Sequence, residues 1–429
     1  MVNTTEFRHL LLSGVFSIIP LIIGCADSEN TPTGPSSIDV SDEYLFVWQF
    51  LDVFFIFRED LPADPYAFQT PQHLYLSVNE PYTRYYPPDS LDHINSSLST
   101  RKSGMGIMVD SVTNGYVVTD VFSRSPAQQA GVQVGDIILS INGQSLAGIS
   151  FAELPDLLGG QVGDQKRLRI GRDQQQITVT VILDEFHSPS VFIDSVDEAT
   201  AYIRITSFLN NTIAEGGTAE EFDSALQNTR WAENTILDLR NNPGGELEQC
   251  IRVTSEFLQD STPLVTVRQR VLISEERAEG RTEELVWRSS PEGGDARGRN
   301  FYVLQNNTTA SASEILIVSL NQYRPEVRTI GSTTFGKARG QVLGVTPDSG
   351  IARVTYATIS PVQAPDYDVV GISPEIAVES QSALDVALQL SRESTARKTG
   401  SSGSLAGRVA LMQRLYNLEG EPILLVRRP

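Results

Sequence analysis

Two residues in the second half of the chain could together activate a hydroxyl group. Ser311 lies in residues 307–316, where small residues lead from an expected strand into an expected helix. Such a turn can present a serine hydroxyl in the open, with the N–H of the next residue free at the helix start. Lys337 follows 26 residues later. A serine is a poor nucleophile until a base takes its proton, and a lysine can be that base if burial lowers its pKa from about 10.4 towards about 7–8. Either residue alone could instead be structural, Ser311 as a helix cap and Lys337 as a solvated side chain.

Few residues are available for other kinds of catalysis. The histidines are His9, His73, His93 and His187, and all four precede the segment that holds Ser311. A Ser-His-Asp triad is therefore hard to build there. The chain has only two cysteines, and it lacks His-Glu-x-x-His and Gly-x-Ser-x-Gly motifs. We therefore expect no metal and no cofactor.

Residues 99–187 predict a separate β-rich module. Its expected strands span residues 116–121, 136–141 and 176–183, and its expected short helices span residues 125–129 and 151–158. The long run SPAQQAGVQVGDIILSINGQ (residues 125–144) resembles a PDZ domain, and the stretch Gly104, Met105, Gly106 and Ile107 is similar to its carboxylate-binding loop. Backbone N–H groups near glycines can capture a C-terminal carboxylate while the peptide adds a strand to the sheet edge. A small barrel with no ligand is the alternative.

Beyond residue 190, alternating strands and helices predict a layered α/β core. The expected strands are residues 201–205, 235–239, 301–305 and 327–330, and the expected helices are residues 219–227, 246–258, 313–321 and 383–391. Cys250 falls on the second helix, where a small buried residue is expected rather than a nucleophile.

A third segment, residues 235–245 (TILDLRNNPGG), predicts a buried strand that ends in a glycine turn at the mouth of the sheet. With this segment the chain resembles the carboxyl-terminal processing peptidases, or tail-specific proteases, a serine/lysine-dyad family. The resemblance covers nearly all of residues 41–392. It comprises a leading helical segment, the PDZ domain, the strand-turn, the TASASE segment and the TFGK loop, in that order.

The resemblance implies a role for each matching residue. Ser311 would be the nucleophile, Lys337 the general base and Gln341 the residue that orients the lysine. The N–H of Ala312 and an N–H of the Gly244-Gly245 turn would form the oxyanion hole, in which a donor is worth about 3–4 kcal/mol to the transition state.

The chain departs from the family pattern in two places. Where the family usually has Gly-Lys-Gly, Lys337 is followed by Ala338 and Arg339. The alanine is expected to strain the loop, and the arginine to push the pKa of the lysine further down. One extra residue occurs around residues 324–326. Neither departure removes a reacting group.

Residues 331–338 also come close to a phosphate-binding loop. They match Gly-x4-Gly-Lys-[Ser/Thr] except at the last place, where Ala338 stands instead of the hydroxyl that holds Mg²⁺. We therefore expect no nucleotide, although nucleotide binding is an alternative for this loop.

The N-terminal residues read as an export signal. A polar start is followed by an apolar run, residues 10–24, that is too short for a membrane span of about 20 residues. The run ends at Cys25 in a pattern that resembles the bacterial lipobox, in which the cysteine is lipidated. Residues 26–40 then form a Ser/Thr/Pro/Gly-rich tether. The expectation is export to the bacterial cell envelope (periplasm), with an anchor in the membrane at Cys25; a cleaved signal with a chance cysteine is the alternative.

The composition fits this interpretation. The 429 residues carry a net charge of −20 with no basic run, so nucleic acid is not an expected partner. The expected fold is a multidomain α+β protein: an α/β layered protease core (190–392), an inserted β-rich PDZ domain (99–187) and an N-terminal helical segment (41–98). A signal (1–25) and tether (26–40) precede them, and a linker and tail (393–429) follow. In residues 41–98, residues 44–58 are too apolar for a surface helix and should pack against another domain.

The expected function is that of a serine endopeptidase. Its PDZ domain would recognise exposed apolar C-terminal tails of protein substrates, and its core would cleave through an acyl-enzyme. A catalytically inactive PDZ scaffold is the alternative.

Overall fold

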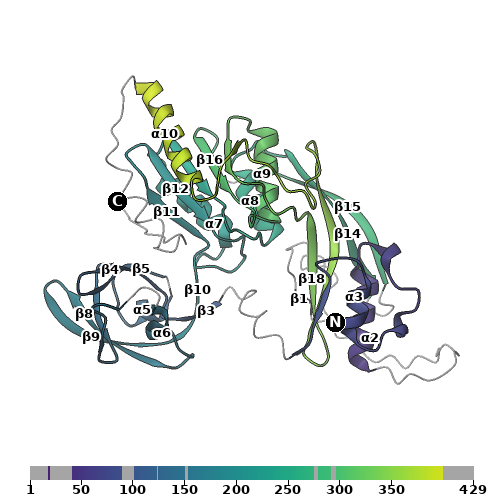
Figure 1. The fold of residues 1–429 in the computed structure, drawn as a ribbon, viewed down its shortest axis with the longest axis horizontal. Coiled ribbons are helices and arrows are strands. Elements are labelled where there is room, and N and C mark those ends of the chain that lie inside the picture. Colours follow the sequence, from purple (N-terminus) through teal and green to yellow (C-terminus); the bar gives the residue numbers. More distant parts are fainter. Residues whose placement is uncertain are drawn as a thin grey trace.

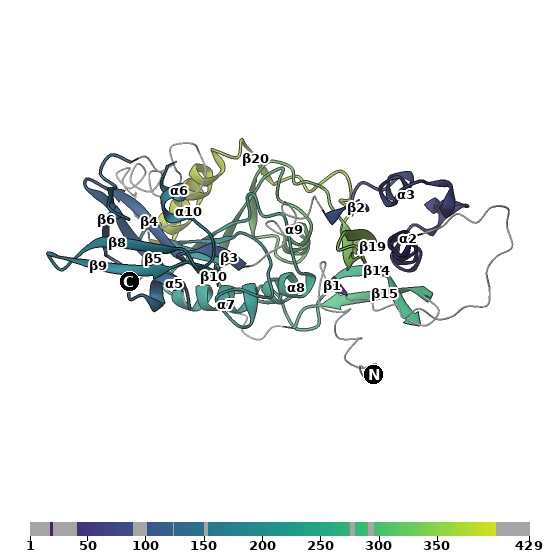
Figure 2. The same cartoon turned by 90° about the horizontal axis from the view of Figure 1, so that it is seen from below.

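The computed structural model describes residues 18–19, 41–88, 101–122, 124–149, 153–274, 279–290 and 296–399. Cys25, the tether and residues 400–429 lie outside these ranges, as do residues 151–152 of one expected helix. The chain is elongated: the β-rich module lies at one end, the segment with α2 and α3 at the other, and the α/β core between them (Figures 1 and 2). The multidomain α+β architecture expected from the sequence is confirmed.

The core is built on a six-stranded sheet in the order β11-β12-β13-β16-β17-β20. Its strands are β11 (Val191–Ser195), β12 (Thr200–Ile205), β13 (Asn234–Asp238), β16 (Asn300–Gln305), β17 (Arg328–Gly331) and β20 (Ile376–Ala377). All neighbours are parallel except the β11–β12 pair. The carboxyl ends of the parallel strands therefore meet at one edge, where loops can bring side chains together.

Helices cover both faces of this sheet because its strands are apolar on both sides. Ile203, Leu237 and Val303 face α7 (Gly217–Asn228), α8 (Leu247–Ser255) and α9 (Ala312–Tyr323) in one buried cluster. Their neighbours Tyr202, Ile236 and Tyr302 face α10 (Ala383–Thr399) in another. This alternation is the two-residue period of a strand.

A second sheet extends the core towards the N-terminal segment. Its strands are β14 (Pro263–Ser274), β15 (Glu279–Arg288), β18 (Arg339–Val345), β19 (Ile351–Pro361), β2 (Arg84–Tyr86) and β1 (Ile18–Ile19). The apolar helix α2 (Asp42–Phe54) packs on this sheet, with the Phe50 ring directly against Gly344, which is the interdomain packing expected from its sequence. Two 3-10 turns (Arg58–Asp60 and Pro65–Ala67) and α3 (Pro71–Ser77) lead to β2.

The β-rich module has its own hydrophobic core. Its sheet has the order β4-β5-β6-β8-β9, with β7 paired to β6. The strands are β4 (Ile107–Val112), β5 (Gly115–Val121), β6 (Ile137–Ile141), β7 (Gln144–Ser145), β8 (Gln165–Arg172) and β9 (Gln175–Ile182), and the helices are α5 (Pro126–Gln129) and α6 (Leu154–Leu158). A two-stranded sheet of β3 (Arg101–Gly104) and β10 (Asp184–His187) joins the module to the rest of the chain. No helix among the described residues is long and apolar enough to span a membrane.

Candidate active site

Ser311 sits at the carboxyl edge of the core sheet, between β16 and α9. It is the N-cap of α9 and has φ 57° and ψ −118°, which is uncommon for a residue other than glycine. The preceding turn is held by the segment that follows β13, because Thr309 Oγ1 donates to the Leu239 carbonyl (2.9 Å) and the Ala310 N–H donates to the Asn242 carbonyl (3.0 Å). The strained turn is therefore fixed by its neighbours, as strained residues at functional sites commonly are.

The glycine turn after β13 lies directly against this serine. A Cβ placed on Gly244 would come within 2.7 Å of Ser311 Cβ and 2.9 Å of the Ala312 nitrogen, so only glycine fits. This close packing leaves Ser311 only 2% exposed, in contrast to the open hydroxyl expected from the sequence.

The N–H groups expected to form the oxyanion hole gather around Ser311, but they are not equivalent. The Gly244 N–H donates to Asn242 Oδ1 (2.9 Å) and is already used. Within the described part of the chain, the N–H groups of Ala312 and Gly245 donate to no acceptor. Of the two glycine amides named from the sequence, that of Gly245 is therefore the one left for a developing oxyanion.

Lys337 lies on the loop between β17 and β18, and its amine is largely removed from water. Burial lowers the pKa of Lys337 to about 8, and the nearby Arg353 guanidinium adds to this, while Glu80 and Glu314 oppose it. The Lys337 Nζ lies 5.1 Å from the centre of the Tyr82 ring. A lysine with this pKa is neutral often enough near pH 8 to act as a base.

Glu314 joins the serine and lysine segments, and no role was assigned to it from the sequence. Its carboxylate is fully buried. One oxygen, Oε2, accepts from the Ser311 N–H and the Lys337 N–H, each at 2.8 Å. The other, Oε1, accepts from Thr334 Oγ1 (2.5 Å) and the Gly336 N–H (2.7 Å). The sequence signal for it is the Ser-x-x-Glu spacing of a helix start, but that spacing does not reveal the contacts with residues 334–337.

Gln341 lies on β18 and is buried. Its Nε2 donates to the carbonyl of Arg339 at 3.1 Å. The orienting contact with Lys337 therefore stays a prediction from the family resemblance.

The two substitutions next to the lysine behave differently from the expectation. Ala338 does not have a left-handed backbone and packs in the main core, so the expected loop strain is absent. Arg339 forms ion pairs with Asp368 (2.8 Å) and Glu80 (3.1 Å), and its guanidinium lies 5.1 Å from the Phe57 ring. The neighbouring cation that lowers the pKa of Lys337 is Arg353 instead. The extra residue at 324–326 lies at the far end of α9 from Ser311.

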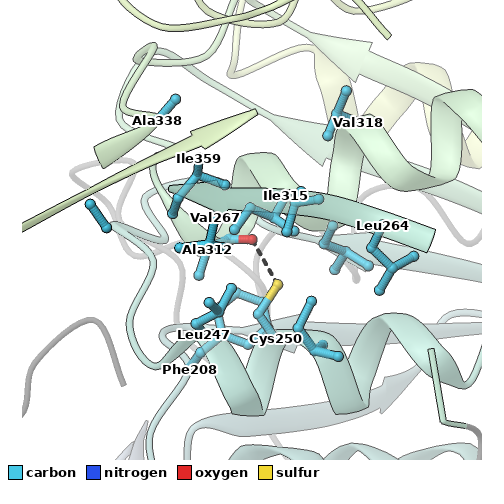
Figure 3. Packing of buried hydrophobic residues seen from close by; sticks show 14 of the residues in the cluster. Phe208, Leu247, Cys250, Leu264, Val267, Ala312, Ile315, Val318, Ala338 and Ile359 are labelled. Atoms are coloured by element: carbon cyan, nitrogen blue, oxygen red, sulfur yellow. Dashed lines mark hydrogen bonds between the residues drawn. The ribbon is translucent and has the colours of Figure 1, made fainter. Parts of the chain in front are cut away.

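Cys250 lies on α8 and contacts the residue that follows Ser311. It is fully buried, its Sγ donates to the Ala312 carbonyl at 2.9 Å (Figure 3), and burial raises the pKa of the thiol to about 12. The thiolate that a nucleophilic cysteine needs is therefore disfavoured, as expected for a structural residue.

The glycine loop of the β-rich module is fixed against α5. The Met105 carbonyl accepts from the Ala127 N–H (2.9 Å), and the Gly106 carbonyl accepts from the Phe122 N–H (3.0 Å). Gly106 has φ 72°, and a Cβ there would lie 2.4 Å from Ser125 Cβ. Because the N–H of a trans peptide points opposite to its carbonyl, the N–H groups of Gly106 and Ile107 point away from these partners. Ile107 begins β4, an edge strand of its sheet.

The Gly244-Gly245 turn beside Ser311 is followed by an acidic residue that was not singled out from the sequence. Glu246 follows Gly245, and burial, with a smaller contribution from Glu248, raises the pKa of its carboxyl to about 8. Its buried Oε2 has no hydrogen-bond partner among the described residues. In the same ranges, no group of three or more His, Cys, Asp or Glu side chains is placed to hold a metal ion.

Comparison with known proteins identifies both folded parts. Residues 199–378 match peptidase family S41, and residues 117–172 match a PDZ domain. The carboxy-terminal processing protease CtpA of Bacillus subtilis (strain 168) is 27% identical over 306 residues, which are 71% of this chain and 62% of that protein. The carboxy-terminal-processing protease of Bartonella bacilliformis is 28% identical over 303 residues, covering 70% of this chain and 67% of that protein.

A solved structure assigned to the S41 proteases, from Bacteroides fragilis NCTC 9343, is 19% identical and covers 87% of this chain and all of its own, with a TM-score of 0.52; it supports the fold. The core of the chain thus matches peptidase family S41, and its β-rich module matches a PDZ domain. It spans about 60% of the length of the Bacillus relative.

Proposed function

We propose that this chain is a serine endopeptidase that binds the C-terminal tail of a protein substrate in its PDZ domain and cleaves with Ser311 and Lys337. The observation that carries the proposal is the shared oxygen of Glu314. This oxygen accepts 2.8 Å hydrogen bonds from the backbone nitrogens of both Ser311 and Lys337 and so holds them close together. The N–H groups of Ala312 and Gly245 nearby have no acceptor in the described ranges.

The proposed reaction follows from these positions. Neutral Lys337 takes the proton of Ser311 Oγ as the oxygen attacks the carbonyl carbon of the substrate. The N–H groups of Ala312 and Gly245 stabilise the oxyanion. The Lys337 ammonium then gives its proton to the leaving amine, and the ester that remains on Ser311 is hydrolysed by water with Lys337 again as base. Because Ser311 is buried, substrate binding has to move part of its cover.

The proposed tail site is the glycine loop of the PDZ domain. A substrate tail would add a strand to the open edge of β4, and its carboxylate would accept from the N–H groups of Gly106 and Ile107. A peptide with an amidated C-terminus should then bind at least tenfold more weakly than the same peptide with a free carboxylate.

The test of the proposal compares the wild-type protein with Ser311→Ala and Lys337→Ala on an unstructured substrate that ends in an apolar tail. The expected result is cleavage by the wild type and a loss of at least a thousandfold in each variant. If all three proteins are equally inactive at every pH tried, the inactive-scaffold alternative is supported instead. In that case the PDZ domain should still bind the substrate tail.

We also propose that the chain is exported and anchored to a membrane through a lipid on Cys25. The proposal rests on the lipobox-like sequence that precedes the cysteine. Replacing Cys25 with Ser should release the protein from the membrane fraction, and continued association would contradict the anchor.

A further inference from the structure

The segment between α3 and β2 is tied to the lysine side of the candidate active site by buried polar contacts. Glu80 is 3% exposed, and its Oε2 accepts from Thr355 Oγ1 (2.7 Å) and from the Tyr82 N–H (3.0 Å). Thr83 Oγ1 accepts from the Thr355 N–H (3.0 Å), and Glu80 Oε1 accepts from Arg339 (3.1 Å). Breaking a contact of this kind would leave a buried polar group without a partner, so the segment is held firmly in place.

These contacts fix Tyr82 over the lysine. The Tyr82 carbonyl accepts from Arg353 Nε at 2.8 Å, and the ring lies with its centre 5.1 Å from Lys337 Nζ. Arg353 is thus both an anchor of the Tyr82 backbone and the cation that lowers the pKa of the lysine. Tyr82 is separated from Lys337 by more than 250 positions in the sequence, yet it forms part of the immediate surroundings of the amine.

The ring acts on the amine in two opposite ways. It keeps water away from the amine, which favours the neutral form and lowers the pKa. Its π-face also attracts the ammonium, which favours the charged form. Replacing the ring by an aliphatic side chain of similar size removes only the second effect, whereas truncation to alanine removes both.

We propose that Tyr82 is a positioning residue of the catalytic centre: its ring shields and orients the amine of Lys337, and the Glu80–Thr355 contacts hold it there. The proposal rests on the proposed function, because it assigns Tyr82 a part in the environment of the base. It makes the N-terminal segment a component of the active site rather than only a packing element.

The test measures the titration of Lys337 directly, in the full chain with Ser311→Ala, so that it does not depend on activity. An amine-specific acylating reagent is applied from pH 6 to 11, and mass spectrometry follows the labelling of Lys337. In Tyr82→Phe the midpoint should equal that of the parent protein. In Tyr82→Ala it should rise by about one pH unit, because water reaches the amine. In Tyr82→Leu it should stay the same or fall, because shielding remains and the π attraction is lost.

The same substitutions in the active protein give the second readout. Tyr82→Ala should lower kcat/KM about tenfold at pH 7 and leave it near the wild-type value at pH 10, since each unit of pKa changes the neutral fraction about tenfold. Tyr66→Ala is the matched control. Tyr66 belongs to the same N-terminal segment but is 40% exposed and stacks on Tyr44, so its replacement should change neither the labelling midpoint of Lys337 nor kcat/KM at pH 7.

An unchanged labelling midpoint in Tyr82→Ala would overturn the proposal, whatever its effect on rate. If Tyr82→Ala does not fold, as judged by thermal unfolding, Tyr82→Leu decides: a midpoint more than about half a unit above the parent would overturn it. Inactivity of the wild type would refute the proposed function but would leave the labelling result, and hence the assignment of Tyr82, intact.

Discussion

Replacing Glu314 with Gln should separate the serine and lysine segments, because the side chain would keep its shape but lose one acceptor. The carboxylate accepts four hydrogen bonds, two at each oxygen. An amide has a single oxygen, so two of the four donors would face an NH2 group. A hydrogen bond to a charged group is worth about 1.5–3 kcal/mol, so the loss of two should destabilise this region by about 3–6 kcal/mol.

Hydrogen exchange measured on peptides covering residues 332–341 is the suitable assay. The PDZ domain and the core have separate hydrophobic clusters, so a single global transition is not the natural measure of a local change. A local cost of about 3–6 kcal/mol corresponds to amide exchange faster by about two to four orders of magnitude at Gly336 and Lys337. Peptidase activity should fall with it, because Lys337 would no longer be held beside Ser311.

Glu221→Gln is the matched control for the same chemical change. Glu221 is also buried, but one oxygen accepts its three hydrogen bonds, from Ser190 N, Ser190 Oγ and Val191 N. The other oxygen has no partner among the residues that the structure describes. An amide can keep those three bonds, so we expect a smaller loss of stability and unchanged activity. If Glu314→Gln keeps its protection within about threefold of the wild type and more than half of its activity, Glu314 does not hold the two segments together.

Three further predictions concern pH and backbone strain. Activity should rise with pH through a midpoint near 8 as Lys337 loses its proton, and Arg353→Met should move the midpoint upward in a pH–rate profile. A flat profile down to pH 6 would contradict a lysine base. In wild-type protein the pKa of Glu246 is about 8, so between pH 4.5 and 8 the folded state keeps a proton that the unfolded state has released. The free energy of unfolding of the wild-type protein should therefore fall across that window, by at most about 5 kcal/mol, whereas that of Glu246→Gln should show no such fall in thermal melts. If the stability of the two proteins depends on pH in the same way, this prediction is wrong. Val369 has φ 70° and is 77% exposed, so Val369→Gly should raise the free energy of unfolding by up to about 1 kcal/mol; a lower melting temperature would refute strain there.

The sequence predicted the parts of the site that depend on local pattern. Small residues before an apolar helix placed Ser311 at the start of α9, and the glycine pair placed the turn beside β13. The strand and helix ranges of the core agree with the structure to within a few residues, except that α10 continues to Thr399 through polar residues that gave no helical pattern.

The parts that the sequence did not predict depend on contacts between distant segments. Glu80 and Thr355 are 275 positions apart, and the local sequence pattern of neither segment predicts the hydrogen bond between them. The expectation for Arg339 was wrong for the same reason, because it treated the guanidinium as an unpaired charge, whereas Asp368 and Glu80 come from separate loops to pair with it. The long strands β14 and β15 were not predicted either, and β14 pairs with the distant strand β19 as well as with β15.

The proposed catalytic centre therefore depends on how the two sheets and the N-terminal segment meet. Ser311 lies at the carboxyl edge of the core sheet, and Lys337 lies just before β18 of the second sheet. With a pKa of about 8, roughly one lysine in ten is neutral at pH 7, whereas at its ordinary value of about 10.5 the fraction is roughly one in three thousand. Any movement that lets water reach this amine would thus reduce the active population by up to about 300-fold without touching the serine. With Lys337 as the proposed base, we expect the loss of a contact as distant as Glu80–Thr355 to lower the rate of the reaction.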